Sequence, residues 1–387
     1  MRILVLSEGN AESWDSWSGI SKSIVDQLRI EGHTVNVGDV DLYGAGRWAA
    51  AVATFSRDRP QWTARYHLGA VPFALRTQKA KRHIAAHRDG IDVILQIGAT
   101  FQASGGIGIP YCLCCDSNVR MAEHGASSGF SWGTALTAEQ LQAVADRERN
   151  IYGGAAAIFT LSEQLRQSFL NDFNMPADRV RAMYAGPNLD LARIPLTAPV
   201  RTAGHPPTVL FVGRQFHRKG GDVLVESFQR VRTELPNAQL IIAGPPAGYV
   251  EGPGITCIGN LDKDRPDQWA PLVAAYASAD VFALPTRFEP FGIAFVEAMH
   301  FGLPCVGPQA WAVPEIIADG ETGFTVAVND VDALTDRLLR LLHDPALARS
   351  MGDAGRKRAQ RLFTWPQAVG RITEVLTKVV HRNHAAN

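Results

Sequence analysis

A strand, a glycine-punctuated turn and the start of a helix are encoded in the stretch Thr208-Val-Leu-Phe-Val-Gly-Arg-Gln-Phe-His-Arg-Lys-Gly-Gly221. The apolar run at its start is typical of a buried strand. Three apolar residues then follow at helical spacing, Val223, Leu224 and Phe228. A strand, turn and helix in this order often bind an anion, because the free amides and the helix dipole favour negative charge. Arg214 and Lys219 would add two cations for a diphosphate.

A helix N-terminus is predicted in a second stretch, Glu289-Pro-Phe-Gly-Ile-Ala-Phe-Val-Glu297. The amides of Phe291, Gly292 and Ile293 would be unpaired donors there, where the helix dipole also favours a phosphate. Glu297 would lie about one turn into the helix, and helical side chains lean toward the N-terminus. Its carboxylate can then accept two hydrogen bonds from a vicinal diol such as a ribose. The stretch is therefore predicted to clamp a sugar nucleotide.

Glu289 precedes this turn and would contact the sugar on the far side of the diphosphate. Without other features, Glu289 and Glu297 would equally be a solvated loop charge and an ordinary helical charge. The turn that carries Arg214 and Lys219 favours the clamp, because independent features then point to the same ligand.

The chain resembles the retaining glycosyltransferases of the large family 4, which have the GT-B fold. The resemblance is carried by the Gly-Arg-x4-Lys-Gly turn, by the segment Arg287 to Glu297 and by the order of the elements. In the first half, Ser18-Gly19, a helical stretch and Glu31-Gly32-His33-Thr34-Val35 are similar to the glycine loop, first helix and second strand of the family. The resemblance covers nearly the whole chain and is most specific in the C-terminal half.

The resemblance implies metal-independent transfer with retention, in which the leaving phosphate helps to deprotonate the acceptor. The residues agree, since Arg214, Lys219 and the amides of Gly292 and Ile293 would neutralise the departing diphosphate. The nearest Asp-x-Asp pattern, Asp39-Val-Asp41, follows a predicted strand far along the chain from the clamp. We therefore expect no metal and no cofactor, the nucleotide sugar being a co-substrate.

The first half supplies further candidates. Gly19 offers a backbone without a side chain where a diphosphate would approach closely, and its alternative is a plain turn glycine. Asp116 follows the fourth predicted strand, where the family often carries a histidine. It would either accept a hydrogen bond from a hydroxyl of the transferred sugar or cap a helix that starts near Asn118. By the resemblance alone, the nucleobase is expected near Asn260 and Leu261.

The length and composition of the chain indicate two globular domains. A chain of 387 residues suits two domains of about 150 to 200 residues each. A hydrophobic content of 46% and a charged content of 20% are typical of a soluble globular protein. Basic and acidic residues number 38 each, so no overall field selects nucleic acid or an anionic membrane.

The sequence predicts a cytoplasmic protein, which could also associate with the inner face of the membrane. No apolar run reaches about 18 residues, and Met1–Leu6 form a strand pattern too short for a signal-peptide core. Five cysteines form an odd set, three of them in Cys112-Leu-Cys114-Cys115. Alternation along a strand would send neighbouring cysteines to opposite faces, and no Cys-x2-Cys pair occurs. We interpret them as structural cysteines.

Alternating strand and helix patterns predict parallel sheets with crossover helices, an α/β architecture of two Rossmann-like domains facing across a cleft. The predicted parts are an acceptor-side domain (1–190), a proline-rich linker (191–207), a nucleotide-sugar domain (208–364), and a crossover helix with a tail (365–387) that packs on the first domain. Predicted strands are 3–7, 35–40, 93–97, 111–115, 157–161, 180–184, 208–212, 239–243, 280–284 and 304–306. Ser162 is predicted to cap a helix.

Two further segments have alternative interpretations. The first is a basic stretch, Arg76, Lys79, Lys81, Arg82, His83, His87 and Arg88. We interpret it as a solvated helix face, with weak peripheral membrane contact as the alternative. The second contains the aromatic residues from Trp48 to Phe73, which either fill the core, our preferred interpretation, or line an acceptor groove.

The sequence thus predicts a retaining glycosyltransferase that moves a hexose from a UDP-sugar, or next a GDP-sugar, to a hydroxyl acceptor. The acceptor would be a glycan, a lipid-linked sugar or a small molecule. The alternatives are a 2-epimerase-like GT-B enzyme, which needs acid and base groups around the sugar, and a non-catalytic sugar-nucleotide-binding scaffold. Nucleic acid is not an expected partner, and no oligomeric state is predicted.

Overall fold

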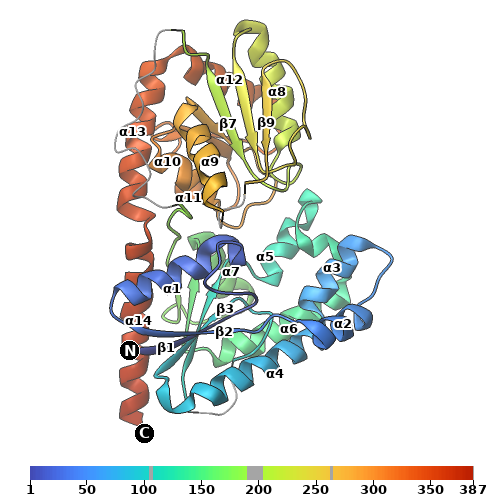
Figure 1. Cartoon of the computed structure of the whole chain (residues 1–387), viewed down its shortest axis with the longest axis vertical. Helices are drawn as coiled ribbons and strands as arrows, with labels where there is room; N and C mark the ends of the chain where they lie inside the picture. Colours follow the sequence, from blue (N-terminus) through green and yellow to red (C-terminus); the bar gives the residue numbers. More distant parts are fainter. Residues whose placement is uncertain (104–107, 190–203, 262–264, 387) are drawn as a thin grey trace. The chain divides into compact units, whose positions relative to one another are not determined.

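A computed structural model describes residues 1–103, 108–189, 204–261 and 265–386 (Figure 1). The chain divides into two compact units, one of Met1–Tyr184 with Trp365–Asn387 and one of Ala185–Thr364. Of the predicted linker 191–207, only residues 204–207 lie within the described residues. Among the described helices, none is both long and apolar enough to cross a bilayer.

The first unit is built on a six-stranded parallel sheet with strand order β2-β1-β3-β4-β5-β6. The strands are β1 (Arg2–Ser7), β2 (Thr34–Asp39), β3 (Val93–Ile97), β4 (Tyr111–Cys115), β5 (Ala157–Thr160) and β6 (Val180–Ala182). The central strands β3 and β4 are buried along their whole length, because helices cover both faces of the sheet. The strands predicted for this half of the chain are confirmed.

Helices connect these strands. They are α1 (Ile20–Ile30), α2 (Gly44–Ala53), α3 (Arg59–Leu68), α4 (Ala70–His87), α5 (Val119–His124), α6 (Ala138–Gly154), α7 (Glu163–Asp172) and α14 (Trp365–Ala386). The predicted cap of α7 is confirmed, since the Ser162 hydroxyl accepts a hydrogen bond from the Leu165 amide at 3.1 Å. Helix α14 packs against α1 and β3, so the last helix of the chain belongs to the first unit. Helix α4 contacts β1 and β2 and lies on the other side of the sheet from α1 (Figure 1).

The interpretation of the basic stretch as a solvated face is wrong for its first residue. Helix α4 buries Pro72, Arg76, Ala80 and Ile84, one residue per turn. The Arg76 side chain is fully buried and forms an ion pair of 2.7 Å with Glu8, which follows β1. A buried guanidinium is stable only beside a counter-charge, and the end of β1 supplies it.

The second unit contains another six-stranded parallel sheet, with strand order β12-β11-β10-β7-β8-β9. The strands are β7 (Thr208–Val212), β8 (Gln239–Ala243), β9 (Ile255–Gly259), β10 (Val281–Ala283), β11 (Cys305–Pro308) and β12 (Gly323–Val326). The predicted strands at 208–212, 239–243, 280–284 and 304–306 are confirmed, although β11 begins and ends slightly later. The two edge strands β9 and β12 were not predicted; β9 is only partly buried, and β12 has four residues.

The helices of the second unit are α8 (Gly221–Glu234), α9 (Pro266–Ser278), α10 (Ile293–His300), α11 (Val313–Ile316), α12 (Val331–His343) and α13 (Pro345–Leu362). An aromatic core ties α9 and α10 to the sheet. The Tyr276 ring stacks on Phe301 with a centroid distance of 4.9 Å, and Phe282 meets Phe295 edge to face at 5.4 Å. This core fixes the part of α10 that carries Glu297.

Two glycines inside helices predict opposite effects of an added methyl group. A Cβ on buried Gly352 in α13 would lie 2.0 Å from the carbonyl oxygen of Gly302. A Cβ on Gly370 in α14 would have no neighbour within 4 Å. We expect Gly370→Ala to stabilise the protein by about 0.5–1 kcal/mol, because alanine favours the helix. Gly352→Ala should destabilise it by about 1–3 kcal/mol, because α13 must shift.

Urea unfolding of both variants, followed by circular dichroism, measures the two effects. Similar shifts of the unfolding midpoint in the same direction would contradict the close approach of α13 to the backbone at Gly302.

Candidate active site

Two turns at the carboxyl edge of the second sheet are joined through their backbones. The amide of Arg287, after β10, donates a hydrogen bond of 2.9 Å to the carbonyl oxygen of Arg218, before α8. Gly220 has a φ of 72°, and a Cβ there would lie 2.0 Å from the Pro285 carbonyl oxygen. Only glycine fits this position, because both the backbone conformation and the space exclude a side chain.

This junction pairs Lys219 with Glu289. The Lys219 ammonium donates to the Glu289 carboxylate, and the two side chains are only 14% and 6% exposed. Burial lowers the pKa of Lys219, while the Glu289 carboxylate acts in the opposite direction. The sequence predicted both residues as separate ligand contacts and did not predict their ion pair.

A second ion pair fixes the same junction. The Arg287 guanidinium donates to both carboxylate oxygens of Asp222, in the first turn of α8, at 2.7 and 2.9 Å. Burial alone would raise the pKa of Asp222, but the hydrogen bonds and charge of Arg287 lower it. Arg218 also donates to the Phe288 carbonyl oxygen. These supporting contacts were not predicted, although Arg287 begins the segment Arg287 to Glu297, because their partners are remote along the chain.

The other predicted cation, Arg214, is exposed just after β7 and has no hydrogen-bond partner among the described residues. The Lys219 side chain packs against the backbone of Gly213, the residue before Arg214. A Cβ added to Gly213 would lie 3.0 Å from the Lys219 Cγ. The β7–α8 turn therefore carries an exposed arginine, Arg214, and a paired lysine, Lys219, whose side chain packs against the backbone next to Arg214. Such a pair can bind a diphosphate, the arginine through its fork of donors and the lysine as a point charge.

The N-terminus of α10 lies where the sequence predicted it. Gly292 is the N-cap, with a φ of 107°, and Ile293 begins the helix. Phe291 is buried and its ring meets Phe363 edge to face. Within the described residues, the amides of Gly292 and Ile293 donate no hydrogen bond, as expected for the first donors of a helix. They are available to an anion.

Glu297 is held more firmly than the sequence suggested. It is 2% exposed, and its carboxylate accepts hydrogen bonds from the Tyr276 hydroxyl at 2.9 Å and from the Asn188 amide at 3.2 Å. Each carboxylate oxygen takes one of these bonds, and a carboxylate has about four acceptor positions. Tyr276 and Asn188 were not predicted, since neither lies near a recognisable motif.

The remaining candidates lie apart from this junction in the chain. Gly19 belongs to the first unit, has a φ of 86° and precedes α1, following Trp17 and Ser18, which also have positive φ. Three successive left-handed residues form a tight turn, and Gly19 and Ile20 are buried where α1 begins. In the second unit, Asn260 is exposed after β9 and Leu261 is half-buried, and residues 262–264 lie outside the described residues.

Asp116 follows β4 in the first unit and is half-buried. Burial raises its pKa to about 6, although the amides of Asp116 and Ser117 act in the opposite direction. The alternative that it caps the next helix is wrong. Asn118 is the cap of α5, because its side chain accepts a hydrogen bond from the Met121 amide at 2.8 Å. The role of Asp116 toward a sugar hydroxyl stays a prediction.

The cysteines of β4, Cys112, Cys114 and Cys115, are buried and free. No group of three or more His, Cys, Asp or Glu side chains is arranged to hold a metal ion within residues 1–103, 108–189, 204–261 and 265–386. Independence from metal stays a prediction.

The chain is similar to known glycosyltransferases in sequence. The family model described as glycosyl transferases group 1 matches residues 197–358. A GDP-mannose-dependent alpha-(1-6)-phosphatidylinositol monomannoside mannosyltransferase from Mycolicibacterium smegmatis is 33% identical over 191 residues, covering 45% of this chain and 48% of that protein. An MMP alpha-(1->4)-mannosyltransferase from Mycolicibacterium hassiacum is 26% identical over 313 residues, covering 79% and 74%. The chain thus matches about half the length of the first of these relatives.

Solved structures share the whole fold. Sucrose-phosphate synthase from Thermosynechococcus elongatus has a TM-score of 0.69 at 20% identity and covers 100% of both chains. Anabaena Alr3699/HepE in complex with UDP-glucose has a TM-score of 0.66 at 16% identity, covering 98% of this chain and 100% of that chain. At these identities the likeness concerns the fold alone.

The raised pKa of Asp116 predicts a pH-dependent stability. Its pKa is about 6 in the folded protein, above the ordinary value of 3.8 that applies to the unfolded chain. The stability that this group contributes is fully present below about pH 4 and is lost as the pH rises through about 6. Asp116→Asn is neutral throughout, so its stability relative to the natural chain should increase between about pH 4 and 7. Urea unfolding at the two pH values measures this.

Glu148, whose pKa burial raises to about 7, is present in both proteins and cancels from the comparison. Asp178→Asn, at an exposed carboxylate of the same unit, is the control and should show no such increase. A stability difference for Asp116→Asn that is the same at both pH values would contradict the raised pKa.

Proposed function

We propose that this chain is a retaining glycosyltransferase, because the family model described as glycosyl transferases group 1 matches residues 197–358 and solved glycosyltransferases share its GT-B fold. It moves a hexose from a nucleotide-diphosphate sugar to a hydroxyl acceptor. The bond from the anomeric carbon to the phosphate oxygen breaks, and a bond from the same carbon to the acceptor oxygen forms. The acceptor proton goes to the departing phosphate.

The observation that carries this proposal is the set of groups at the carboxyl edge of the second sheet. An unpaired Arg214, the paired Lys219 and the free amides at the start of α10 all suit a diphosphate. Negative charge grows on the leaving phosphate during transfer, and fixed positive groups stabilise it without reorganisation. Ligands of open parallel sheets bind at this edge.

Glu289 and Glu297 have different roles in the proposal. Glu289 keeps the Lys219 ammonium in place and contacts the sugar, and Glu297 accepts hydrogen bonds from the ribose. The contacts from Tyr276 and Asn188 orient the Glu297 carboxylate before the nucleotide binds.

For the donor, GDP-mannose is the first candidate, because the name of the relative that is 33% identical specifies GDP-mannose. A UDP-sugar, the first expectation from the sequence, is the second candidate. The acceptor is a hydroxyl-bearing glycan, lipid-linked sugar or small molecule, and the cytoplasm, including the inner membrane face, is the proposed location. We also propose that transfer needs no divalent cation, so the activity should be retained in the presence of EDTA.

The products separate the proposal from its alternatives. A transferase releases GDP or UDP slowly from the right donor even without an acceptor. A 2-epimerase forms the epimer of the sugar, and a non-catalytic scaffold binds the nucleotide without turnover. Screening GDP-, UDP- and ADP-sugars for protection against thermal unfolding identifies the donor, because a ligand of the folded state stabilises it by mass action.

Removing Lys219 should slow turnover more than it weakens donor binding. Lys219→Ala takes away a charge that acts mainly on the departing phosphate, so we expect kcat to fall by about 100- to 1,000-fold. The single variant also leaves the Glu289 carboxylate buried without its partner, so the double variant Lys219→Met with Glu289→Gln removes both charges of the pair. Glu289→Gln alone is measured beside it, because Glu289 is also proposed to contact the sugar. Initial rates of GDP release and calorimetric donor affinity give the two values.

Lys357→Ala, at an exposed position of α13, is the matched control and should keep full turnover. Equal losses of turnover and donor affinity in Lys219→Ala would assign this lysine to ground-state binding only.

Replacing Glu297 by glutamine should weaken nucleotide binding by about 1 to 3 kcal/mol, as expected for a charge-assisted hydrogen bond. Glutamine keeps the shape of the side chain and one acceptor oxygen, so the fold should persist. Calorimetric titration with GDP and UDP at a temperature well below unfolding measures the loss. Glu321→Gln, at an exposed position of the same unit, is the control. Unchanged affinity for both nucleotides would leave Glu297 with a purely structural role.

A further inference from the structure

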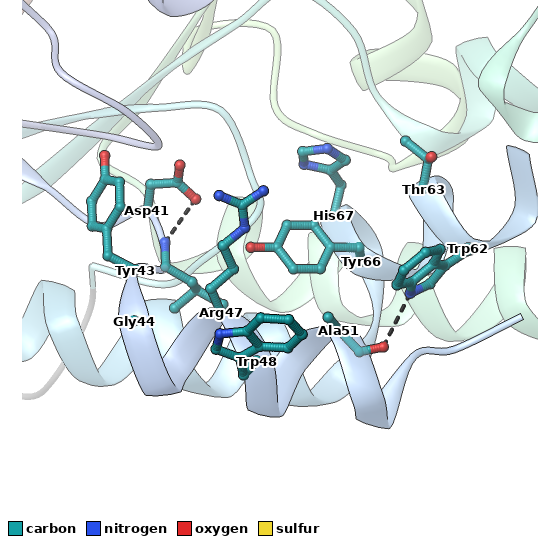
Figure 2. A pocket seen from close by; sticks show the side chains of 11 residues that line it. Asp41, Tyr43, Gly44, Arg47, Trp48, Ala51, Trp62, Thr63, Tyr66 and His67 are labelled. Atoms are coloured by element: carbon teal, nitrogen blue, oxygen red, sulfur yellow. Dashed lines mark hydrogen bonds between the residues drawn. The ribbon is translucent and has the colours of Figure 1, made fainter. Parts of the chain in front are cut away.

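A pocket in the first unit contains none of the predicted donor-site residues. It has a volume of about 880 Å³ and lies between α2, α3 and the loop that follows β2 (Figure 2). Ligand pockets of proteins commonly measure about 300 to 1,000 Å³. Part of its lining comes from the loop that follows β2, so the pocket lies at the carboxyl edge of the first sheet.

Aromatic side chains in this pocket are exposed where the sequence favoured a core. Trp48 is 74% exposed, and Tyr43 is 59% exposed. The interpretation of this segment as core is therefore wrong for Trp48. Trp62 and Tyr66 are half-buried and complete the aromatic lining. Exposed aromatic rings around a cavity are typical of a binding site, because soluble proteins otherwise cover them.

The pocket is held in shape by polar contacts. The Trp62 indole donates to the Ala51 carbonyl oxygen at 3.0 Å, which joins α3 to α2 (Figure 2). Beneath Tyr66 lies the buried Arg76 guanidinium, 5.5 Å from the ring centroid, and it donates to the His67 carbonyl oxygen at 3.0 Å. The walls are thus fixed before any ligand binds, which lowers the entropic cost of binding.

Two opposite charges project into this aromatic frame. The Asp41 carboxylate is oriented by the Leu42 amide, which donates to it at 2.7 Å. Arg47 is exposed and makes no ion pair or side-chain hydrogen bond within the described part of the chain. Figure 2 shows its guanidinium pointing toward the space between Asp41 and Tyr66. The Asp41 carboxylate also lies 4.0 Å from the buried Arg76 guanidinium. The pocket thus offers a strong acceptor in Asp41 and a strong set of donors in Arg47.

We propose that this pocket binds a polyhydroxylated ring, and that this ring is the sugar of the acceptor. A sugar ring has an apolar C–H face that stacks on Trp48 and a rim of hydroxyls that donate to Asp41 and accept from Arg47. The assignment to the acceptor rests on the proposed function, whereas binding of the ring does not.

A lipid surface is the alternative partner for this part of the first unit. Trp48 and Val52 on α2 and Phe55 just after its end are spaced at i, i+4 and i+7 and are all exposed. A membrane surface, however, would contact a convex apolar face and would gain nothing from the Asp41 carboxylate, which anionic headgroups repel. The concave shape of the pocket and the presence of both an acidic and a basic side chain favour a polyhydroxylated ring over a lipid surface.

The test uses the full chain and three probes: methyl α-D-mannopyranoside, methyl α-D-glucopyranoside and myo-inositol. Saturation-transfer NMR detects contact with each probe, and tryptophan fluorescence gives its affinity. We expect at least one probe to bind and its affinity to fall by about tenfold or more in Trp48→Ala, because this substitution removes the apolar aromatic surface on which the ring stacks. Asp41→Asn and Arg47→Ala should each weaken the same probe.

Val52→Ala is the matched control, because Val52 is also 74% exposed on α2 but does not line the pocket. It should bind the probe as the natural chain does. Affinity for GDP should be the same in Trp48→Ala as in the natural chain, so a failure of the donor site is recognised separately from a failure of this pocket. With an active donor, Trp48→Ala should raise the acceptor KM more than it lowers kcat.

Absence of binding by all three probes would overturn the proposal. So would equal losses in Trp48→Ala and Val52→Ala, since the pocket would then not be the binding surface. Binding of phosphatidylglycerol vesicles that both substitutions weaken, with no response to the sugars, would assign the α2 face to a lipid surface instead.

Discussion

The candidate donor site depends on one backbone hydrogen bond, from the Arg287 amide to the Arg218 carbonyl oxygen, together with the close approach of Gly220 to Pro285. This contact joins two turns that follow β7 and β10, strands that are adjacent in the sheet although 70 positions separate Lys219 from Glu289. Any side chain at position 220 would force the turns apart. The ion pair of Lys219 and Glu289 is a consequence of this geometry and cannot form without it.

Both units use the same edge of a parallel sheet for polar chemistry. In the first unit, Glu8, Asp41 and Asp116 follow β1, β2 and β4, and in the second the cationic turn follows β7. Strand interiors are buried by helices on both faces, so polar side chains that must reach a ligand gather where the strands end. The buried pair of Arg76 and Glu8 belongs to this pattern, because Arg76 joins α4 and the last turn of α3 to the end of β1.

The sequence predicts the fold where burial is complete and fails where it is partial. Strands such as β3 and β4 are buried throughout and mostly apolar and were predicted, whereas β9 lies at a sheet edge, is only partly buried and was not predicted. The helix tip at Gly292 was predicted because its signal is local. The partners of Glu297 were not, since the Tyr276 hydroxyl and the Asn188 amide meet it only through tertiary packing. The residues next to Glu297 along the chain therefore do not show how deeply its carboxylate is buried.

The exposure of Trp48 follows from helix geometry once the buried face of α2 is known. Ala50 is fully buried, and residues two positions away lie about 200° around a helix with about 3.6 residues per turn. Trp48 and Val52 must therefore point outward, and both are 74% exposed. The small side chain of Ala50 lets α2 pack closely on the unit, while Trp48 and Val52 face away from it. Burying Trp48 would require rotating α2 by half a turn, which would expose Ala50 and break the contact of Trp62 with Ala51. An aromatic ring that the helix cannot bury is available for a ligand, which is why hydrophobicity alone led to the wrong interpretation here.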